Sequence, residues 1–244
     1  MQLCFTVDWE DWYHGLGLPD DIKAKQPRRI KVGHDILMNL LDKYKIKATF
    51  YVLGESVQEF PELVKEIQQG GHEIGCHTWS HSFVYDLTPQ QFHEEIKKCK
   101  EVIKPFQDGY ENFRAPYFSI TEKSKWALDI LKQEGFTYDS SIFPGNTFRT
   151  GIIGFDKQIH TLPNGLKEFP ISNFPITKFD VGVGGAYFRI LPYPYFKYKL
   201  KSILKNRPGV FYFHPWEFDH QQPYIGKGVK QRAVHTHYAN LAAT

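Results

Sequence analysis

Two histidines, His77 and His81, stand four residues apart in the segment HTWSH. Neutral imidazole is a common ligand for zinc-like ions, so such a pair could hold a metal. A spacing of four would place both rings on one face of a helix. The segment, however, follows a Gly-Gly turn at Gly70 and Gly71 and a strand-like run, which indicates a strand that continues into a loop. A metal site built on this pair needs a third ligand from elsewhere in the chain.

Other segments that read as strands are also followed by side chains that could do chemistry. These are carboxylates after the first strand, and an arginine, a tyrosine, a further aspartate, a histidine and a tryptophan after later ones. The residues are Asp8, Glu10, Asp11, Arg114, Tyr117, Asp139, His214 and Trp216. If the strands are parallel, these groups share one edge of the sheet, where active groups collect in βα-repeat folds. Together they form the inventory of a metal-dependent hydrolase.

The elements that must position these residues alternate between strand and helix. Runs such as LCFTV, ATFYVLG and GVFYFHPWEF predict strands, and the segments between several of them have apolar residues at helical spacing. One predicted helix begins with Thr88 as N-cap and Pro89 at the first position. This alternation predicts parallel strands with helical crossovers, and therefore an α/β fold. The stretch 142–191 breaks the pattern and predicts loops and short strands, with β-like patches such as GGAYFRI.

Length and composition narrow the class of protein. The 244 residues are within reach of one α/β barrel, and no linker, repeat or low-complexity segment divides them, so we expect a single domain over 1–244. A formal net charge of +3, evenly spread, argues against a nucleic-acid binder. The three cysteines fit a reducing compartment, and no signal segment or membrane span is visible. We therefore expect a cytoplasmic protein.

Five motifs in order resemble the polysaccharide deacetylases, the NodB-homology or carbohydrate esterase family 4 enzymes. FTVDWED corresponds to the first acidic motif of this family, HTWSH to its metal-binding motif and FRAPY to its R-x-P-Y motif, while YDSS and FYFHPW correspond to the last two. The resemblance covers nearly the whole chain and implies a distorted barrel of seven or eight β/α units. The variants DWEDWYH, YDSSIFP and FHPWEF further resemble a subgroup that accompanies bacterial exopolysaccharide and O-antigen synthesis.

The resemblance implies that His77 and His81 bind a divalent metal, most often zinc, with cobalt, nickel or manganese as alternatives. The family motif has two adjacent aspartates, of which the second is a ligand, and here Trp9 occupies that second position. Alternation along a continuing strand favours Glu10 as the carboxylate ligand. If the chain turns at Trp9, Asp11 becomes the ligand instead. The departure also leaves open a weakly bound metal, or none.

The same resemblance implies roles for the remaining residues. Asp8 is expected to be the catalytic base, with Arg114 as the partner that keeps it ionised. The backbone N–H of Tyr117 would bind the oxyanion, and His214 would be the general acid, oriented by Asp139. Two aromatic residues are expected to bind the sugar: Trp216 and Phe143.

The function that follows is metal-dependent removal of an N-acetyl group from an amino sugar in cell-surface polysaccharide synthesis. The substrate would be a nucleotide-linked, lipid-linked or oligosaccharide N-acetyl sugar, and no nucleic acid is expected as a partner. Two alternatives keep the fold. One is a deformylase or an amidohydrolase on a small cyclic amide. The other is a metal-free carbohydrate-binding homologue, which the presence of a base, its partner and an acid disfavours.

Overall fold

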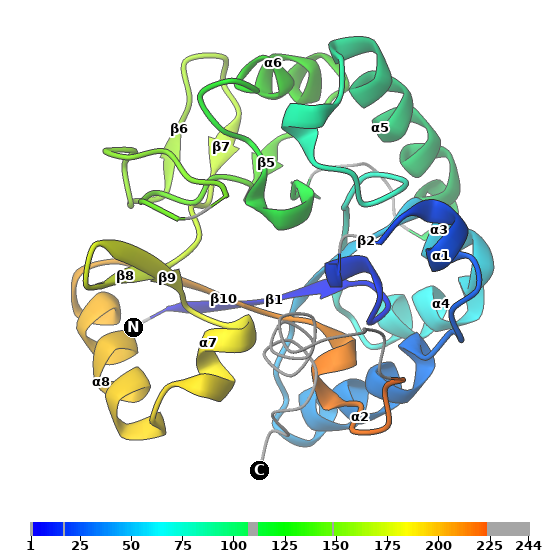
Figure 1. The fold of residues 1–244 in the computed structure, drawn as a ribbon, viewed down its shortest axis with the longest axis horizontal. Helices are drawn as coiled ribbons and strands as arrows, with labels where there is room; N and C mark the ends of the chain where they lie inside the picture. The colour runs from blue at the N-terminus through cyan, green and yellow to red at the C-terminus, as the bar shows by residue number, and fades with distance from the viewer. Residues whose placement is uncertain (1, 17, 107–111, 148, 224–244) are drawn as a thin grey trace.

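A curled sheet forms the centre of the computed structural model, which describes residues 2–16, 18–106, 112–147 and 149–223 (Figure 1). The strand order is β10-β1-β2-β3-β4-β5-β7-β6, in which all neighbours are parallel except β7 and β6. The strands of this sheet are β1 (Leu3–Trp9), β2 (Thr49–Val52), β3 (Glu73–Cys76), β4 (Asn112–Phe113), β5 (Tyr138–Asp139), β6 (His160–Thr161), β7 (Lys167–Glu168) and β10 (Gly209–Phe213). A separate antiparallel hairpin joins β8 (Asn173–Ile176) to β9 (Phe179–Gly182).

Helices lie around the outside of this sheet (Figure 1). The α-helices are α1 (Asp20–Lys23), α2 (Ile30–Lys43), α3 (Gly54–Glu59), α4 (Pro61–Gln69), α5 (Pro89–Ile103), α6 (Trp126–Gln133), α7 (Gly185–Ile190) and α8 (Tyr193–Asn206). Short 3₁₀ turns follow several strands or helices: η1 (His14–Leu16), η2 (Val84–Asp86), η3 (Lys104–Phe106), η4 (Pro116–Phe118) and η5 (Pro215–Phe218). Within the described residues, no helix is both long and apolar enough to cross a bilayer.

Helix α5 shows why the sequence forms these elements. The Thr88 hydroxyl accepts a hydrogen bond from the Gln91 backbone N–H, and the Gln91 side chain accepts one from the Thr88 N–H, which completes a capping box. Pro89 occupies the first helical position, where its missing N–H has no intrahelical partner to lose. The apolar residues that recur at helical spacing along α5 are fully buried: Phe92, Ile96, Cys99 and Ile103.

The α/β prediction is confirmed, and one local prediction is wrong. The segment GGAYFRI, expected to be β-like, contains helix α7. Gly184 and Gly185 both have positive φ, at 139° and 52°, so the chain turns sharply there and leaves the extended conformation. A β-bridge from Gly184 to Tyr212 ends the strand-like part, and the helix begins directly after it. The last part of the predicted single domain, residues 224–244, lies outside the described residues.

The contact between α2 and η5 fixes the end of strand β10. Gly33 lies so close to Pro215 that a Cβ atom there would stand 1.9 Å from the Pro215 carbonyl oxygen. Only a residue without a side chain allows this approach. Helix α2 therefore holds the turn that follows His214, the histidine at the end of the last strand.

Candidate active site

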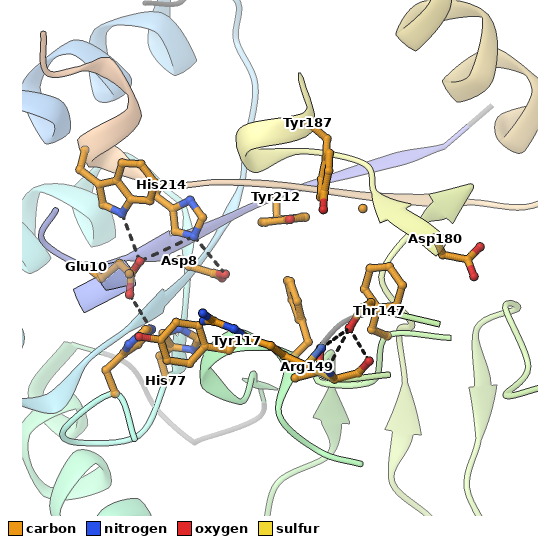
Figure 2. A pocket seen from close by; sticks show the side chains of 17 residues that line it. Asp8, Glu10, His77, Tyr117, Thr147, Arg149, Asp180, Tyr187, Tyr212 and His214 are labelled. Atoms are coloured by element: carbon orange, nitrogen blue, oxygen red, sulfur yellow. Dashed lines mark hydrogen bonds and ion pairs between the residues drawn. The ribbon is translucent and has the colours of Figure 1, made fainter. Parts of the chain in front are cut away.

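A cavity of about 430 Å³ opens at the carboxyl ends of the parallel strands (Figure 2). Asp8 and Glu10 both line it from the end of β1. Trp9 between them has no exposed surface and donates its indole N–H to His34 Nδ1 at 3.2 Å, on the core side of the strand. Strand alternation thus directs the two carboxylates to one side, and the Glu10 N–H turns back to the Asp8 carbonyl at 3.1 Å.

Glu10, His77 and His81 form a buried group whose potential ligand atoms all lie within 4.8 Å of one another. His77 comes directly after β3, which ends at Cys76, so the segment is a strand that runs into a loop. Thr78 and His81 have positive φ, at 67° and 63°, and this loop returns His81 to a ring-centroid distance of 5.3 Å from His77. The two histidines therefore meet through a turn rather than across a helix face.

The hydrogen bonds and protonation of this group suit a divalent cation. His77 Nδ1 lies 2.6 Å from the Arg114 carbonyl oxygen and must donate to it, which leaves Nε2 as the acceptor or ligand atom. Burial lowers the pKa of His77 to about 4, with His81 adding to the effect and Asp8 opposing it, so the imidazole is neutral.

Glu10 supplies the negative charge of the group. Burial alone would raise the pKa of Glu10, but His81, with help from His214, lowers it below its usual value. The Glu10 Oε2 atom approaches His81 Nε2 to 2.5 Å without hydrogen-bond geometry, and it is buried. A buried carboxylate oxygen without a hydrogen-bond donor beside two imidazoles is an incomplete polar site, and the donor set of two nitrogens and one oxygen fits a zinc-like ion.

Asp11, the alternative ligand, is not in this group. Its Oδ2 accepts the backbone N–H groups of Arg29 at 2.8 Å and Ile30 at 3.1 Å, and its Oδ1 accepts that of Trp12 at 2.8 Å. The first two of these N–H groups belong to the start of α2 and to the loop before it. Asp11 therefore caps helix α2 from a distant part of the sequence, and the expectation that it reaches the metal is wrong for this geometry.

Arg114 lies against Asp8, as the sequence predicts. Its side chain has no exposed surface, and its Nη1 donates to Asp8 Oδ1 at 2.7 Å and to Thr6 Oγ1 at 2.9 Å, while Nη2 donates to Ser140 Oγ at 2.9 Å. Burial would raise the pKa of Asp8, but Arg114, followed by His77 and His214, lowers it. Asp8 is therefore ionised and held in one orientation at neutral pH.

His214 enters the cavity from the end of β10. Its Nε2 lies 3.8 Å from Asp8 Oδ2 and 3.7 Å from Glu10 Oε1. Its ring stacks on Trp216 at a centroid distance of 4.7 Å, and the Trp216 indole N–H donates to Glu10 Oε1 at 3.1 Å. Burial lowers the pKa of His214, but the hydrogen bond to Glu217 and the nearby Glu10 outweigh it and raise the pKa above the usual value.

The carboxylate that orients His214 is Glu217, not Asp139. His214 Nδ1 lies 2.7 Å from Glu217 Oε1, and Glu217 Oε2 lies 2.8 Å from Arg189 Nε. Asp139 instead accepts the Ser141 hydroxyl at 2.5 Å. The predicted contact between Asp139 and His214 is therefore wrong, because the Asp139 carboxylate is bound to Ser141 and lies beside Glu168.

Asp139 supports a different part of the site. Ser141, which donates to Asp139, accepts the Ala115 backbone N–H at 2.8 Å, directly after Arg114. Asp139 is buried beside Glu168, and burial and the Asp139 charge raise the pKa of Glu168 well above its usual value. Through Ser141, Asp139 therefore holds the chain segment that carries Arg114 and Tyr117.

The predicted aromatic and oxyanion residues all line the cavity: Tyr117, Phe143 and Trp216. Tyr117 has a φ of 55° and stacks on Phe83 at 4.1 Å, with its hydroxyl donating to the His14 carbonyl oxygen. Phe143 and Trp216 are only 4% and 3% exposed, so most of each ring packs against protein. They can offer an edge, rather than a whole face, to a sugar.

Sequence reasoning missed Glu217 and Arg189. One signal was present for Glu217, which stands three residues after His214 across a turn that begins with Pro215, the spacing of a capping box. The Glu217 carboxylate accepts the His214 backbone N–H at 2.9 Å as well as its ring N–H. No sequence pattern connects Arg189 with this pair, because it comes from α7.

Two family models and several curated proteins are similar in sequence to this chain. A family model described as polysaccharide deacetylase matches residues 31–138, and a second, a domain of unknown function (DUF3473), matches residues 140–244. The chain is 28% identical over 171 residues to a peptidoglycan-N-acetylglucosamine deacetylase of Bacillus cereus, covering 64% of this chain and 61% of the relative. It is 33% identical over 138 residues to a peptidoglycan deacetylase of Helicobacter pylori, and the match covers 56% of this chain and 46% of that relative. Residues 31–138 thus resemble a polysaccharide deacetylase domain.

The fold has a similar counterpart among solved structures. The crystal structure of a putative polysaccharide deacetylase from Mycobacterium smegmatis superposes with a TM-score of 0.59 at 19% identity, covering 88% of this chain and 76% of that one. The chain spans about a quarter to three fifths of the length of the first curated relatives it matches.

Proposed function

We propose that the protein is a metal-dependent hydrolase that removes the N-acetyl group from an amino sugar. The observation that carries the proposal is that three groups converge on one cavity: the ionised pair of Asp8 and Arg114, the buried ligand group of Glu10 and two histidines, and His214. A base, a cation site and a second proton carrier at one point are what amide hydrolysis requires. The deacetylase names of the relatives support the same reaction.

In this mechanism, Asp8 takes a proton from the attacking water. Arg114 keeps the carboxylate ionised and fixes its orientation through the 2.7 Å hydrogen bond. A divalent cation held by Glu10, His77 and His81 would lower the pKa of the water and polarise the amide carbonyl. Zinc is the cation that two imidazoles and one carboxylate favour.

The second half of the reaction needs a proton on the leaving amine. His214 has a raised pKa and can donate this proton from Nε2, which faces Asp8 and Glu10. Glu217 accepts the Nδ1 proton and so fixes the ring orientation. The backbone N–H of Tyr117 would donate to the oxyanion from the wall of the cavity.

We also infer that the two matched regions form one catalytic domain. Strand β1, which precedes both regions, pairs in parallel with β2 of the first region on one side and with β10 of the second region on the other. Asp8 and Glu10 stand at the end of β1 and His214 at the end of β10, so neither region alone contains the complete site.

For the biological substrate we propose an amino sugar of exopolysaccharide or O-antigen synthesis. Support comes from the motif variants DWEDWYH, YDSSIFP and FHPWEF, which resemble that subgroup. Peptidoglycan is the competing substrate, because several relatives are named peptidoglycan deacetylases.

Acyl release tests the proposal. The protein would be stripped with a chelator, reloaded with Zn²⁺, Co²⁺, Ni²⁺ or Mn²⁺, and assayed for acetate and formate with nucleotide-linked, lipid-linked and oligomeric N-acyl sugars and with peptidoglycan. We expect metal-dependent acetate release that Asp8→Asn abolishes. Formate without acetate would make the enzyme a deformylase. Acetate release that is unchanged by both the chelator and Asp8→Asn would refute the mechanism.

A further inference from the structure

The cavity extends well beyond the hydrolytic centre. Figure 2 shows Thr147 and Asp180 on the far side from His214 and Glu10, Tyr187 and Tyr212 between the two ends, and Arg149 between Tyr117 and Thr147. At about 430 Å³, the cavity has room for more than one acetamido sugar. A group attached to the reacting sugar would therefore reach the far end.

Arg149 is the one lysine or arginine among the described residues that line this cavity. Its guanidinium has no ion-pair partner within the described part of the chain. Burial and the Asp86 carboxylate raise the pKa of Tyr85, and Arg149 opposes that rise, which places the positive charge near the aromatic stack of Tyr85, Phe83 and Tyr117. The stack leads from this charge back to His81, whose ring lies 4.5 Å from that of Tyr117.

The loop that carries Arg149 is anchored on both sides. Its base closes through the Ile152 N–H and the Phe143 carbonyl oxygen at 2.9 Å. The Thr147 hydroxyl oxygen accepts the backbone N–H groups of Arg149 at 3.2 Å and Thr150 at 2.8 Å. Fixing the backbone in this way reduces the entropy lost when the side chain binds a ligand.

A tie to the β8–β9 hairpin anchors the other side of the loop. Asn146 N–H donates to Asp180 Oδ2 at 3.0 Å, and the Asn146 side chain donates to the Lys178 carbonyl oxygen at 3.0 Å. Gly151, with a φ of 108°, packs so closely on Gly145 that a Cβ atom would stand 2.3 Å from the Gly145 carbonyl oxygen.

Asp180, a carboxylate that also lines the cavity, does not cancel the charge of Arg149. Its Oδ2 accepts the Asn146 N–H, and its Oδ1 lies 3.8 Å from Lys157 Nζ. The wall of the cavity beyond Tyr117 therefore presents a guanidinium that is available for an external anion. A planar guanidinium recognises carboxylate and phosphate through paired hydrogen bonds.

We propose, building on the proposed function, that the natural substrate carries an anionic group next to the N-acyl sugar, and that Arg149 binds it. The group is a phosphate on the anomeric oxygen or a carboxylate on the adjoining sugar, and both offer the same oxygen pair to the guanidinium. Arg149 thereby selects substrate and takes no part in the chemistry at the amide.

Steady-state kinetics with three probes test this. The probes are an N-acetylglucosamine tetramer, which is neutral, a hyaluronan tetrasaccharide, which carries carboxylates, and UDP-N-acetylglucosamine, which carries phosphates. For the preferred anionic probe we expect Arg149→Gln to lower kcat/KM roughly tenfold, mainly through KM, as for loss of a charged hydrogen bond at an exposed site. The neutral probe should change by less than about twofold, and the two anionic probes reveal which group is bound.

Two controls keep the test specific. Lys178→Gln removes a neighbouring positive charge outside the cavity lining and should leave all three probes unchanged. Arg149→Lys should retain part of the preference because it keeps the charge without the planar fork. Equal kcat/KM for neutral and anionic probes, unaffected by Arg149→Gln, would overturn the proposal while leaving the hydrolase proposal intact.

Binding in a variant that cannot turn over separates the two proposals. Calorimetry with Asp8→Asn should show tighter binding of an anionic probe than of the tetramer, and Arg149→Gln added to that variant should remove the difference. If this holds but no probe releases acetate in the wild-type protein, the anion site stands and the proposed function fails. If anionic and neutral probes bind equally, the anion site is refuted whether or not acetate is released.

Discussion

Separate replacement of Glu10 and Asp11 should divide metal binding from helix capping. The two carboxylates are adjacent in sequence, but the structure gives them different surroundings: Glu10 faces His77 and His81, and Asp11 caps the start of α2. We expect Glu10→Gln to lose the metal and keep most of its stability, and Asp11→Asn to lose stability and keep the metal.

The expected sizes follow from the contacts. Glu10→Gln removes a charged ligand, and affinity should fall by more than the roughly 10–100-fold that removal of a residue merely supporting a ligand causes. In the wild-type protein the two carboxylate oxygens of Asp11 accept three backbone N–H groups. Asp11→Asn keeps only one oxygen, so at least one of these N–H groups would face the amide N–H₂ instead of an acceptor. Since a hydrogen bond to a charged group contributes about 1.5–3 kcal/mol, unfolding should become easier by about 2 kcal/mol.

Two measurements on each variant check this. Zinc affinity is measured by competition with a chromophoric chelator, and the free energy of unfolding by urea titration of the metal-free protein. In metal-free Glu10→Gln, the free energy of unfolding should change by less than about 1 kcal/mol, because the amide oxygen can still accept the indole N–H of Trp216. Lost zinc affinity in Asp11→Asn together with unchanged affinity in Glu10→Gln would refute the reasoning.

Three further outcomes are expected. His77→Ala and His81→Ala should each abolish metal retention, measured by atomic absorption after gel filtration, while far-UV circular dichroism stays close to wild type. Asp8→Asn should keep the metal and lower kcat by roughly 10²–10⁴-fold, the usual loss for a general base, and retained turnover would remove Asp8 from the mechanism. The pKa of His214 is higher in the folded protein than the unfolded value of about 6.5. The stability that the His214 proton contributes is therefore fully present below the unfolded pKa. Both the proton and this stability are lost as the pH rises through the folded pKa. Glu217→Gln should therefore shift the alkaline limb of the kcat/KM profile to lower pH; an unshifted limb would contradict the role of Glu217.

The positions along β1 could be predicted because a strand has a fixed period. Asp8 and Glu10 share a side, Trp9 takes the other, and this simple alternation is enough to favour Glu10 over Asp11 as the ligand. The same applies to His77, Arg114 and His214, each of which follows a parallel strand and so reaches the same edge of the sheet. Local periodicity and topology carry this part of the site.

The partner of His214 could not be predicted in the same way. Asp139 is the last residue of the parallel strand β5, but its carboxylate accepts the hydroxyl of Ser141 and is not the partner of His214. Glu217 reaches the ring only because η5 is a tight turn, and it is held there by Arg189 from α7, a helix that the sequence pattern presents as β-like. A contact between a turn and a helix that are far apart in the sequence produces no periodic pattern of residues, so the sequence does not predict it.

The pairing of β1 with β10 has a consequence for synthesis of the protein. Because Leu3 lies beside Gly209, the nascent chain must emerge from the ribosome at least as far as Gly209 before the first strand gains its second neighbour. Until then β1 is an open edge, able to recruit strands from other chains, and its slow, long-range closure leaves time for aggregation. Asp8 and Glu10 stand on that edge. The polypeptide therefore brings His214 beside Asp8 and Glu10 and closes this strand edge in one late folding step.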